Sequence, residues 1–355
     1  MRLPSILWNE RSRSPFGSGK SLFAETMATQ VTRWFVLILL LLLAATSIWA
    51  GPPQEAPEIP PYTISLNVDL VLLDVSVVDH DGRFVSDLEA ENFKIYEDGR
   101  PETIAYFLKK DVPVTVGLAI DNSGSMHGKR AGIVAAAMSF VEASNPHDEM
   151  FVVHFNEQVR FGLSPPQLFT NNPIQVRGAL LRMISDGQTA LYDAVSQAME
   201  HFGKARHNRK ALLVVSDGGD NASHHELKET LQLVQSSHVV VYTISLYDPS
   251  NRDQKPRVLR RLSKTSGGES FFPKELDQVG PICHSIATDI RNQYLIAYRS
   301  SNSKRDGAFR QVRVLLDVPA RKNLVVRTRE GYFAPSDSGT AGRASVMKKE
   351  TPGEP

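Results

Sequence analysis

The chain has little cysteine and no excess of charge of either sign. Cys283 is the single cysteine among 355 residues, so no disulfide can form within the chain. Stability must come from a buried core instead, and we expect Cys283 to be a small buried residue on a helix. Its 40 Lys and Arg residues against 39 Asp and Glu give a net charge of +1. So small a charge provides no general attraction to polyanions, and we predict no nucleic-acid partner.

The histidines lack a zinc-binding arrangement. His127, His154, His224 and His225 fall near expected loop ends, but no spacing of Cys or His matches a zinc site. The adjacent His224 and His225 are expected to point in different directions. We therefore interpret all four as surface or capping residues.

Long apolar runs are also scarce, since only residues 31–50, VTRWFVLILLLLLAATSIWA, form one. Arg33 precedes the apolar core at 34–50 and small residues close it, which is typical of a secretory signal cleaved after Ser47 or Ala50. This signal region covers residues 1–50, and we expect translation to start at Met27. The predicted location is secreted or periplasmic. The alternative is an uncleaved amino-terminal membrane anchor, because 17 apolar-core residues reach the lower limit for a spanning helix.

The rest of the chain divides into segments of different pattern. Residues 51–61 are a proline-rich linker, 62–110 and 294–334 are β-rich, and 335–355 are predicted to be a disordered tail. Between the β-rich flanks, residues 111–293 alternate apolar strands with helical patterns. Strands are expected at 114–120, 150–155, 211–215 and 239–245, and helices at 131–143, 190–202 and 276–293.

This order predicts an α/β fold, a doubly wound and mostly parallel sheet with helices on both faces. Neither β-rich flank is large enough to be a stable sandwich by itself. We therefore predict that 62–110 and 294–334 pair in one β-sandwich-like domain, with the α/β domain inserted between its halves.

Three strand-to-helix junctions of the α/β segment carry oxygen ligands. Asp121, Ser123 and Ser125 follow one buried strand at alternate positions, Thr189 lies at the mouth of a helix, and Asp217 ends another buried strand. Loops at the carboxyl ends of such strands converge on one crevice, so these groups can meet. Oxygen ligands suit a small hard cation such as Mg²⁺ or Mn²⁺. The competing interpretation of the first loop is a polar turn that caps the next helix.

In these residues the sequence resembles the von Willebrand factor A domain. The resemblance assigns Asp121, Ser123 and Ser125 to the first loop of a metal-ion-dependent adhesion site, Thr189 to the second and Asp217 to the third, so every ligand position is filled. It implies bound Mg²⁺, with Mn²⁺ or Ca²⁺ as alternatives. An Asp or Glu side chain of a protein or matrix partner would complete the metal shell.

Two further acidic residues neighbour this set. Asp193 and Asp220 could orient the ligands without binding the metal themselves, although Asp193 could also face solvent on its helix.

The β-rich flanks extend the resemblance. From Tyr96-Glu97-Asp98-Gly99 to Gly331-Tyr332-Phe333-Ala334, the chain resembles a bacterial family described as von Willebrand factor A-related proteins, over residues 62–334. This family resemblance implies the fold and the site but no established activity. From the site and the signal-like segment, we interpret the protein as an extracytoplasmic, metal-dependent protein-binding module for adhesion or complex assembly, not an enzyme. The alternative is a hydrolase in which Ser123 or Ser125 is the nucleophile or the metal activates water. A serine nucleophile needs a neighbouring base, and His127 is the only histidine close to a motif loop. The hydrolase alternative is therefore disfavoured.

Overall fold

The computed structural model describes residues 70–109, 111–182, 186–246 and 254–336. The predicted signal region, the proline-rich linker and the tail from residue 337 onward lie outside these ranges. Within them, no helix has the length and apolar character needed to cross a membrane.

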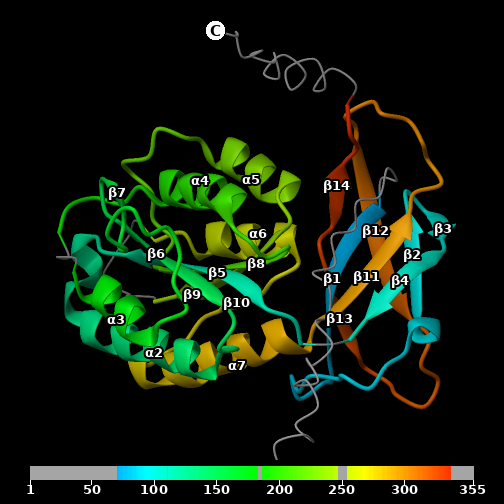
Figure 1. Ribbon diagram of the computed structural model, residues 1–355, viewed down its shortest axis with the longest axis horizontal. Coiled ribbons are helices and arrows are strands. Elements are labelled where there is room, and N and C mark those ends of the chain that lie inside the picture. The colour runs from blue at the N-terminus through cyan, green and yellow to red at the C-terminus, as the bar shows by residue number, and fades with distance from the viewer. Residues whose placement is uncertain (1–69, 110, 183–185, 247–253, 337–355) are drawn as a thin grey trace, which may run out of the picture. The chain divides into compact units, whose positions relative to one another are not determined.

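A six-stranded sheet is the centre of the α/β part (Figure 1). Its strand order is β10-β9-β8-β5-β6-β7, with all pairs parallel except the edge pair β6 and β7. The strands are β5 (Val114–Asp121), β6 (Glu149–Phe155), β7 (Val159–Phe161), β8 (Arg209–Ser216), β9 (Val239–Ser245) and β10 (Ser270–Phe271). The sheet is mostly parallel, as the sequence predicts.

Helices cover both faces of this sheet. Figure 1 shows α4, α5 and α6 on one face and α2, α3 and α7 on the other. Their bounds are α2 (Arg130–Ala143), α3 (Pro173–Leu181), α4 (Leu191–His201), α5 (Leu227–Ser236), α6 (Pro256–Ser266) and α7 (Val279–Asn292), with 3₁₀ turns η1 (Ala90–Asn92), η2 (Gly124–Lys129), η3 (Phe202–Lys204) and η4 (Leu276–Gln278). The predicted doubly wound fold is confirmed. The sequence interpretation missed α3, α5 and α6, which span only 9, 10 and 11 residues and so show brief apolar stripes.

The central strands are buried on both faces. Every residue of β5, β6 and β9 is buried, which explains why these strands appear in the sequence as continuous apolar runs. The packing is close, because a Cβ atom at Gly117 of β5 would lie only 2.6 Å from Cζ of Phe151 on β6. Since β5, β8 and β9 run parallel, the loops that follow them leave from the same edge of the sheet.

Two antiparallel four-stranded sheets complete the described chain. Their orders are β13-β1-β11-β4 and β14-β12-β2-β3. The strands are β1 (Leu70–Val78), β2 (Phe93–Glu97), β3 (Arg100–Glu102), β4 (Ile104–Leu108), β11 (Tyr294–Arg299), β12 (Phe309–Leu316), β13 (Val325–Arg327) and β14 (Gly331–Phe333). Val75, Ile95, Tyr294 and Val312, two from each sheet, belong to one buried apolar cluster. Two sheets that share a core form a sandwich.

Strands from both ends of the described chain alternate in these sheets. β1 pairs with β11, β4 with β11, and β2 with β12. The chain therefore leaves the sandwich after β4, builds the six-stranded sheet and its helices, and returns at β11.

The buried carboxyl of Asp289 on α7 is hydrogen-bonded to strands of the antiparallel sandwich and of the six-stranded sheet. Asp289 accepts hydrogen bonds from Ser76 Oγ (2.5 Å), Tyr242 Oη (2.9 Å) and Arg327 Nη2 (3.0 Å). Ser76 and Arg327 lie in β1 and β13, and Tyr242 lies in β9. Burial raises the pKa of Asp289 to about 6, against the hydrogen bonds that it accepts. The side chain of Asp289 thus connects α7 with the sandwich and with the six-stranded sheet.

Candidate metal centre

The first predicted ligand, Asp121, is the last residue of β5 and is 1% exposed. Its Oδ1 accepts a hydrogen bond from the backbone N–H of Ser123 (2.8 Å), and its Oδ2 accepts one from Ser216 Oγ (2.6 Å). Ser123 precedes η2, but its side chain makes no capping hydrogen bond. The capping interpretation of the Ser123 hydroxyl is therefore wrong.

Two hydroxyls connect this first loop with the third. Ser123 Oγ and Ser125 Oγ are 3.2 Å apart, and Ser125 Oγ donates to Asp217 Oδ2 at 3.0 Å. Asp217 is buried and follows β8, the strand beside β5. The structure thus brings Asp121, Ser123, Ser125 and Asp217 together at the carboxyl ends of two neighbouring strands.

The Thr189 loop is hydrogen-bonded to both of the other loops. Gly187 O accepts from the N–H of Gly124 (3.1 Å), which lies between the two serines. The N–H of Thr189 donates to Asn221 Oδ1 (2.8 Å), and the N–H of Asn221 donates back to Thr189 O (3.0 Å). Since Asn221 lies four residues after Asp217, this reciprocal pair holds the second loop against the third.

The charge of the cluster suits a cation. Burial raises the pKa of Asp121 to about 6, although hydrogen bonds from Ser123 and Ser216 oppose the rise, and the nearby Asp217 carboxylate adds to it. Within the four described ranges, no Lys or Arg side chain pairs with Asp121. A buried carboxylate without a cationic neighbour is costly, and a bound cation would remove that cost. Two carboxylates and three hydroxyls are oxygen donors of the type that Mg²⁺, Mn²⁺ and Ca²⁺ prefer.

Asp220 lies behind the cluster and contacts the start of α4. Its Oδ2 accepts from the N–H of Tyr192 (2.9 Å) and from Ser223 Oγ (2.6 Å), and Ser223 Oγ in turn accepts from the N–H of Asp193 (3.1 Å). Tyr192 is three residues after Thr189. The side chain of Asp220 therefore connects the third loop to the start of α4, the helix that Thr189 precedes.

Asp193 is buried and binds His224 and His225, the two residues that follow Ser223. Its oxygens accept from the backbone N–H groups of His224 and His225 and from both Nδ1 atoms, at 2.9 Å and 2.7 Å. Burial alone would raise the pKa of Asp193, but these hydrogen bonds outweigh it and hold the pKa well below its usual range. The expectation that the two rings point in different directions is wrong, because each ring takes one oxygen of the same carboxylate.

His154 also differs from its predicted surface position. It lies within the fully buried β6, where its ring contacts Asn122 Nδ2 (2.8 Å) through Nδ1 and Ala179 O (2.9 Å) through Nε2. Burial lowers the pKa of His154 to about 4, so the ring is neutral and Nε2–H donates to the carbonyl. His127, in contrast, is exposed on η2.

The sequence interpretation missed several contributors to this cluster. Ser216 could have been found, because it directly precedes Asp217 at the end of a buried strand. Asn221 and Glu157 carry no such signal, since their importance depends on which loop each one meets. Glu157 Oε2 accepts from the N–H of Gln188 (3.0 Å), beside Gly187, whose φ of +79° suits glycine.

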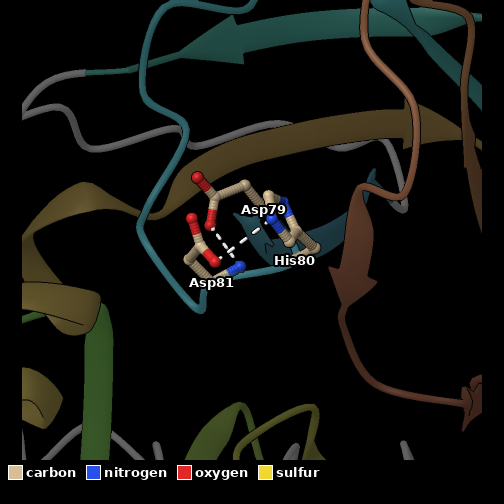
Figure 2. A group of neighbouring side chains, drawn as sticks. All are labelled: Asp79, His80 and Asp81. Carbon is tan, nitrogen blue, oxygen red and sulfur yellow. Dashed lines mark hydrogen bonds and ion pairs between the residues drawn. The ribbon is translucent and has the colours of Figure 1, made fainter.

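A second group of acidic residues lies elsewhere, in the exposed turn after β1. Figure 2 shows Asp79, His80 and Asp81 with their ligand atoms close together. Asp79 Oδ1 accepts from the backbone N–H groups of Asp81 and Arg83, both at 2.9 Å, and Asp81 pairs with the side chains of His80 and Arg83. These contacts account for the arrangement as a charged turn, and we assign no metal site to it.

A mostly parallel α/β sheet, with oxygen-bearing side chains on the loops at its carboxyl edge, defines the general class of this domain. A family comparison is more specific: residues 116–219 match the model of the von Willebrand factor type A domain. This range contains Asp121, Ser123, Ser125, Thr189 and Asp217. The chain therefore carries a von Willebrand factor A domain, as the sequence predicts. No curated protein matches the chain.

Solved structures that match this chain share little sequence with it. A von Willebrand factor type A protein from Catenulispora acidiphila is 12% identical over 79% of this chain and 78% of its own (TM-score 0.44). An aerotolerance-related membrane protein from Bacteroides fragilis is 15% identical over 50% of this chain and 98% of its own (TM-score 0.40). Proximal thread matrix protein 1 from the mussel byssus, with a zinc-occupied adhesion motif, is 14% identical over 56% and 50% (TM-score 0.45). At these scores none of them supports an argument about function.

Proposed function

We propose that this protein binds a partner protein through a divalent cation held by Asp121, Ser123, Ser125, Thr189 and Asp217. The observation that carries the proposal is the hydrogen bond of 3.0 Å from Ser125 Oγ to Asp217 Oδ2, which joins the loops after β5 and β8. Side chains 92 residues apart thereby present their oxygens to one place. Thr189 is fixed to both loops through Gly187 and Asn221.

The ligand set explains why a partner's acidic side chain would bind. Mg²⁺, the cation we propose first, prefers six oxygen ligands and keeps waters that another oxygen can replace. Asp121 and Asp217 would balance its charge, while the hydroxyls of Ser123, Ser125 and Thr189 add none. When bound, the cation would offer a coordination position to an Asp or Glu of the partner. Mn²⁺ and Ca²⁺ are the alternatives.

The setting of this site is also part of the proposal. The signal-like segment at residues 1–50 supports an extracytoplasmic location, secreted or periplasmic, with an amino-terminal membrane anchor as the alternative. We propose that residues 111–293 form the metal-binding domain and that 62–110 and 294–334 form the sandwich around its two ends.

The hydrolase alternative has no observation in its favour. The hydroxyls of Ser123 and Ser125 are hydrogen-bonded to each other, and the hydroxyl of Ser125 donates to Asp217. No histidine among residues 70–109, 111–182, 186–246 and 254–336 is hydrogen-bonded to either one. A serine nucleophile needs such a base within reach.

A capture experiment tests the proposal directly. The full chain, immobilised through a carboxyl-terminal tag, is incubated with the extracytoplasmic fraction of the source cells in Mg²⁺ or in EDTA. We expect a partner that is retained only in Mg²⁺, that is lost with Asp121→Ala, and that is kept by Glu200→Gln at the far end of α4. Retention of the same partner in EDTA and by Asp121→Ala would contradict the metal bridge. Thermal melting of each variant verifies that it is folded.

A further inference from the structure

The stretch of chain that forms β7 and α3 has exposed apolar side chains but no acidic residue. β7 is the last strand in the order of the six-stranded sheet, and α3 follows it in the chain (Figure 1). No residue from Gln158 to Ser185 is acidic. Ile174 of α3 is 80% exposed. Four of the eight large apolar side chains that are exposed in the described chain belong to this stretch: Phe161, Leu168, Ile174 and Leu181.

Contacts hold β7, the loop after it and α3 together as one surface. The ring of Phe161 stacks on His201, with 4.4 Å between the ring centroids, and His201 Nε2 lies 3.1 Å from Leu168 O. Gln167 Nε2 donates to Gln175 Oε1 (2.9 Å) in the first turn of α3. The loop that carries Leu168 therefore contacts the start of α3 and shares His201 with β7.

Arginines supply the charge of this surface, and none of them is paired with a carboxylate. Arg182 Nη1 donates to Ser164 Oγ (2.5 Å), and Arg130 Nη2 donates to Leu181 O (2.6 Å). Within residues 70–109, 111–182, 186–246 and 254–336, these arginines form no ion pair with Asp or Glu. They are Arg130, Arg160, Arg177 and Arg182, and together with the four apolar side chains they form what we call the β7–α3 edge.

The two acidic residues that bound the stretch do not pair with these arginines. Glu157 Oε2 accepts from the N–H of Gln188 (3.0 Å), and Asp186 Oδ1 accepts from the N–H of Gly187 (2.8 Å). Both carboxylates thus contact the loop that carries Thr189. The β7–α3 edge therefore offers unpaired cations beside exposed apolar side chains.

We propose that the β7–α3 edge binds the surface of a membrane that contains anionic phospholipids. The planar guanidinium group of arginine matches phosphate through two N–H groups. Exposed Phe, Leu and Ile side chains enter the boundary between headgroups and acyl chains, and nearby cations add attraction to anionic lipid. A lipid surface requires no matching shape, which suits apolar side chains spread over a strand, a loop and a helix.

This inference goes beyond the proposed metal-dependent function. None of the residues of the β7–α3 edge belongs to the proposed ligand set, so membrane binding needs no cation at Asp121. The signal-like segment at residues 1–50 supports an encounter with a membrane, because an exported chain crosses one.

Vesicle sedimentation tests the inference with the predicted mature chain from Gly51 onward. This chain keeps every described element and lacks the apolar segment at 34–50, which would bind lipid by itself. It is mixed in EDTA with vesicles of phosphatidylglycerol and phosphatidylcholine in equal parts, or of phosphatidylcholine alone. EDTA prevents a bound cation from bridging to phosphate. We expect binding to the anionic vesicles only, and a loss of this binding in high salt.

Two substitutions separate the contributions of charge and apolar surface. Arg177→Gln should weaken binding to the anionic vesicles about fivefold, the effect of one cation near such a surface. Ile174→Ser should weaken it about five- to tenfold, because less apolar surface leaves water. The matched controls Arg313→Gln and Leu315→Ser remove an exposed cation and an exposed apolar side chain from β12, and they should bind as the wild type does. Thermal melting verifies that each variant is folded.

A tryptophan at position 174 measures insertion directly. Trp8, Trp34 and Trp49 are the only tryptophans of the chain, so the predicted mature chain has none. In Ile174→Trp, the emission should move to shorter wavelength on anionic vesicles and should be quenched by brominated acyl chains. Leu315→Trp should show neither change.

Three results would overturn the inference. The first is binding that does not distinguish anionic from neutral vesicles, and the second is binding that Arg177→Gln and Ile174→Ser leave unchanged. The third is the result that an acidic protein partner predicts, namely no binding to vesicles but retention on immobilised polyglutamate that Arg177→Gln weakens. All of these measurements are made in EDTA, so their failure and the failure of the metal bridge are distinguishable.

Discussion

The hydroxyl of Tyr332 lies 2.9 Å from Oε2 of Glu97 and donates a hydrogen bond to it across 235 residues of chain. Tyr298 Oη (2.8 Å) and Ser300 Oγ (2.6 Å) donate to the same carboxylate, and Arg310 pairs with it. Glu97 is only 2% exposed, so these groups form a buried polar network. Glu97 and Tyr332 belong to the two short segments in which the flanks resemble the von Willebrand factor A-related family. The network gives a physical reason for their proximity, because the first segment supplies the carboxylate and the second supplies one of its donors.

Removal of the Tyr332 hydroxyl should destabilise the sandwich. We expect Tyr332→Phe to lower the free energy of unfolding by about 1–2 kcal/mol, because a buried charged acceptor loses one donor. Urea denaturation followed by circular dichroism measures the change. Tyr96→Phe, in the same strand as Glu97, is the matched control and should change it by less than about 0.5 kcal/mol. Equal losses from both substitutions would show that the network does not matter.

Binding of the cation should stabilise the folded protein. Mg²⁺ or Mn²⁺ at about one hundred times its dissociation constant should add about 2.7 kcal/mol, which appears as a rise in the melting temperature that EDTA reverses. Asp217→Asn should abolish the rise. Asp289→Asn, which changes another buried carboxyl away from the site, should retain it even if the protein melts earlier. A rise that persists in Asp217→Asn would mean that the cation binds elsewhere.

Asp193 should influence metal affinity without being a ligand. Asp193→Asn keeps the shape of the side chain but loses the charge that holds His224 and His225, so the segment that carries Asn221 should loosen against Thr189. We expect metal affinity to fall about tenfold, as is typical when a group behind a ligand is changed. Titration with Mn²⁺ measures it by calorimetry. Lys228→Ala, at an exposed position of α5, is the control. An affinity unchanged in Asp193→Asn would refute this role of Asp193.

His154 should make stability depend on pH between about 4 and 6.5. The pKa of His154 is lowered to about 4 in the folded protein, so in this interval the unfolded chain binds a proton that the folded one does not. Stability therefore falls as the pH drops from about 6.5 toward 4, by up to about 1.4 kcal/mol per pH unit. Urea midpoints across this range should vary less steeply with acidification in His154→Gln than in the wild type.

Carboxyl groups whose pKa is raised by burial act in the opposite direction and do not affect this comparison. The pKa values of Asp121 and Asp289 are raised to about 6, so each carboxyl favours folding as the pH falls. Both remain in the wild type and in His154→Gln. The exposed His284→Gln should keep the wild-type dependence on pH, and a slope shared by all three proteins would exclude His154 as its source.

Much of the fold could be predicted because its signals are local. The strands β5, β6, β8 and β9 are buried on both faces and appear as apolar runs, and their predicted bounds are within two residues of those observed. Short helices such as α3 were missed because nine residues hold too little periodicity. The antiparallel direction of β7 was also not predictable, since three residues do not reveal their partner.

The candidate site shows a similar division. The chemical type of the candidate ligands was visible in the sequence, because oxygen-bearing side chains that follow a buried strand or precede a helix are a local pattern. These residues are Asp121, Ser123, Ser125, Thr189 and Asp217. Their supports were not visible. Asn221, Glu157 and the His224 and His225 pair act through loops that meet only after the strands are ordered in the sheet.

The sequence by itself thus determined the four long strands of the central sheet and the positions of the oxygen-bearing side chains beside them, because both follow from side-chain chemistry and short-range periodicity. Only the tertiary structure decided that Ser125 meets Asp217, that two histidines share the carboxylate of Asp193, and that Tyr332 reaches Glu97. These contacts depend on strand order and on the paths of loops, which the burial of the whole core fixes together. No local pattern along the chain encodes such distances.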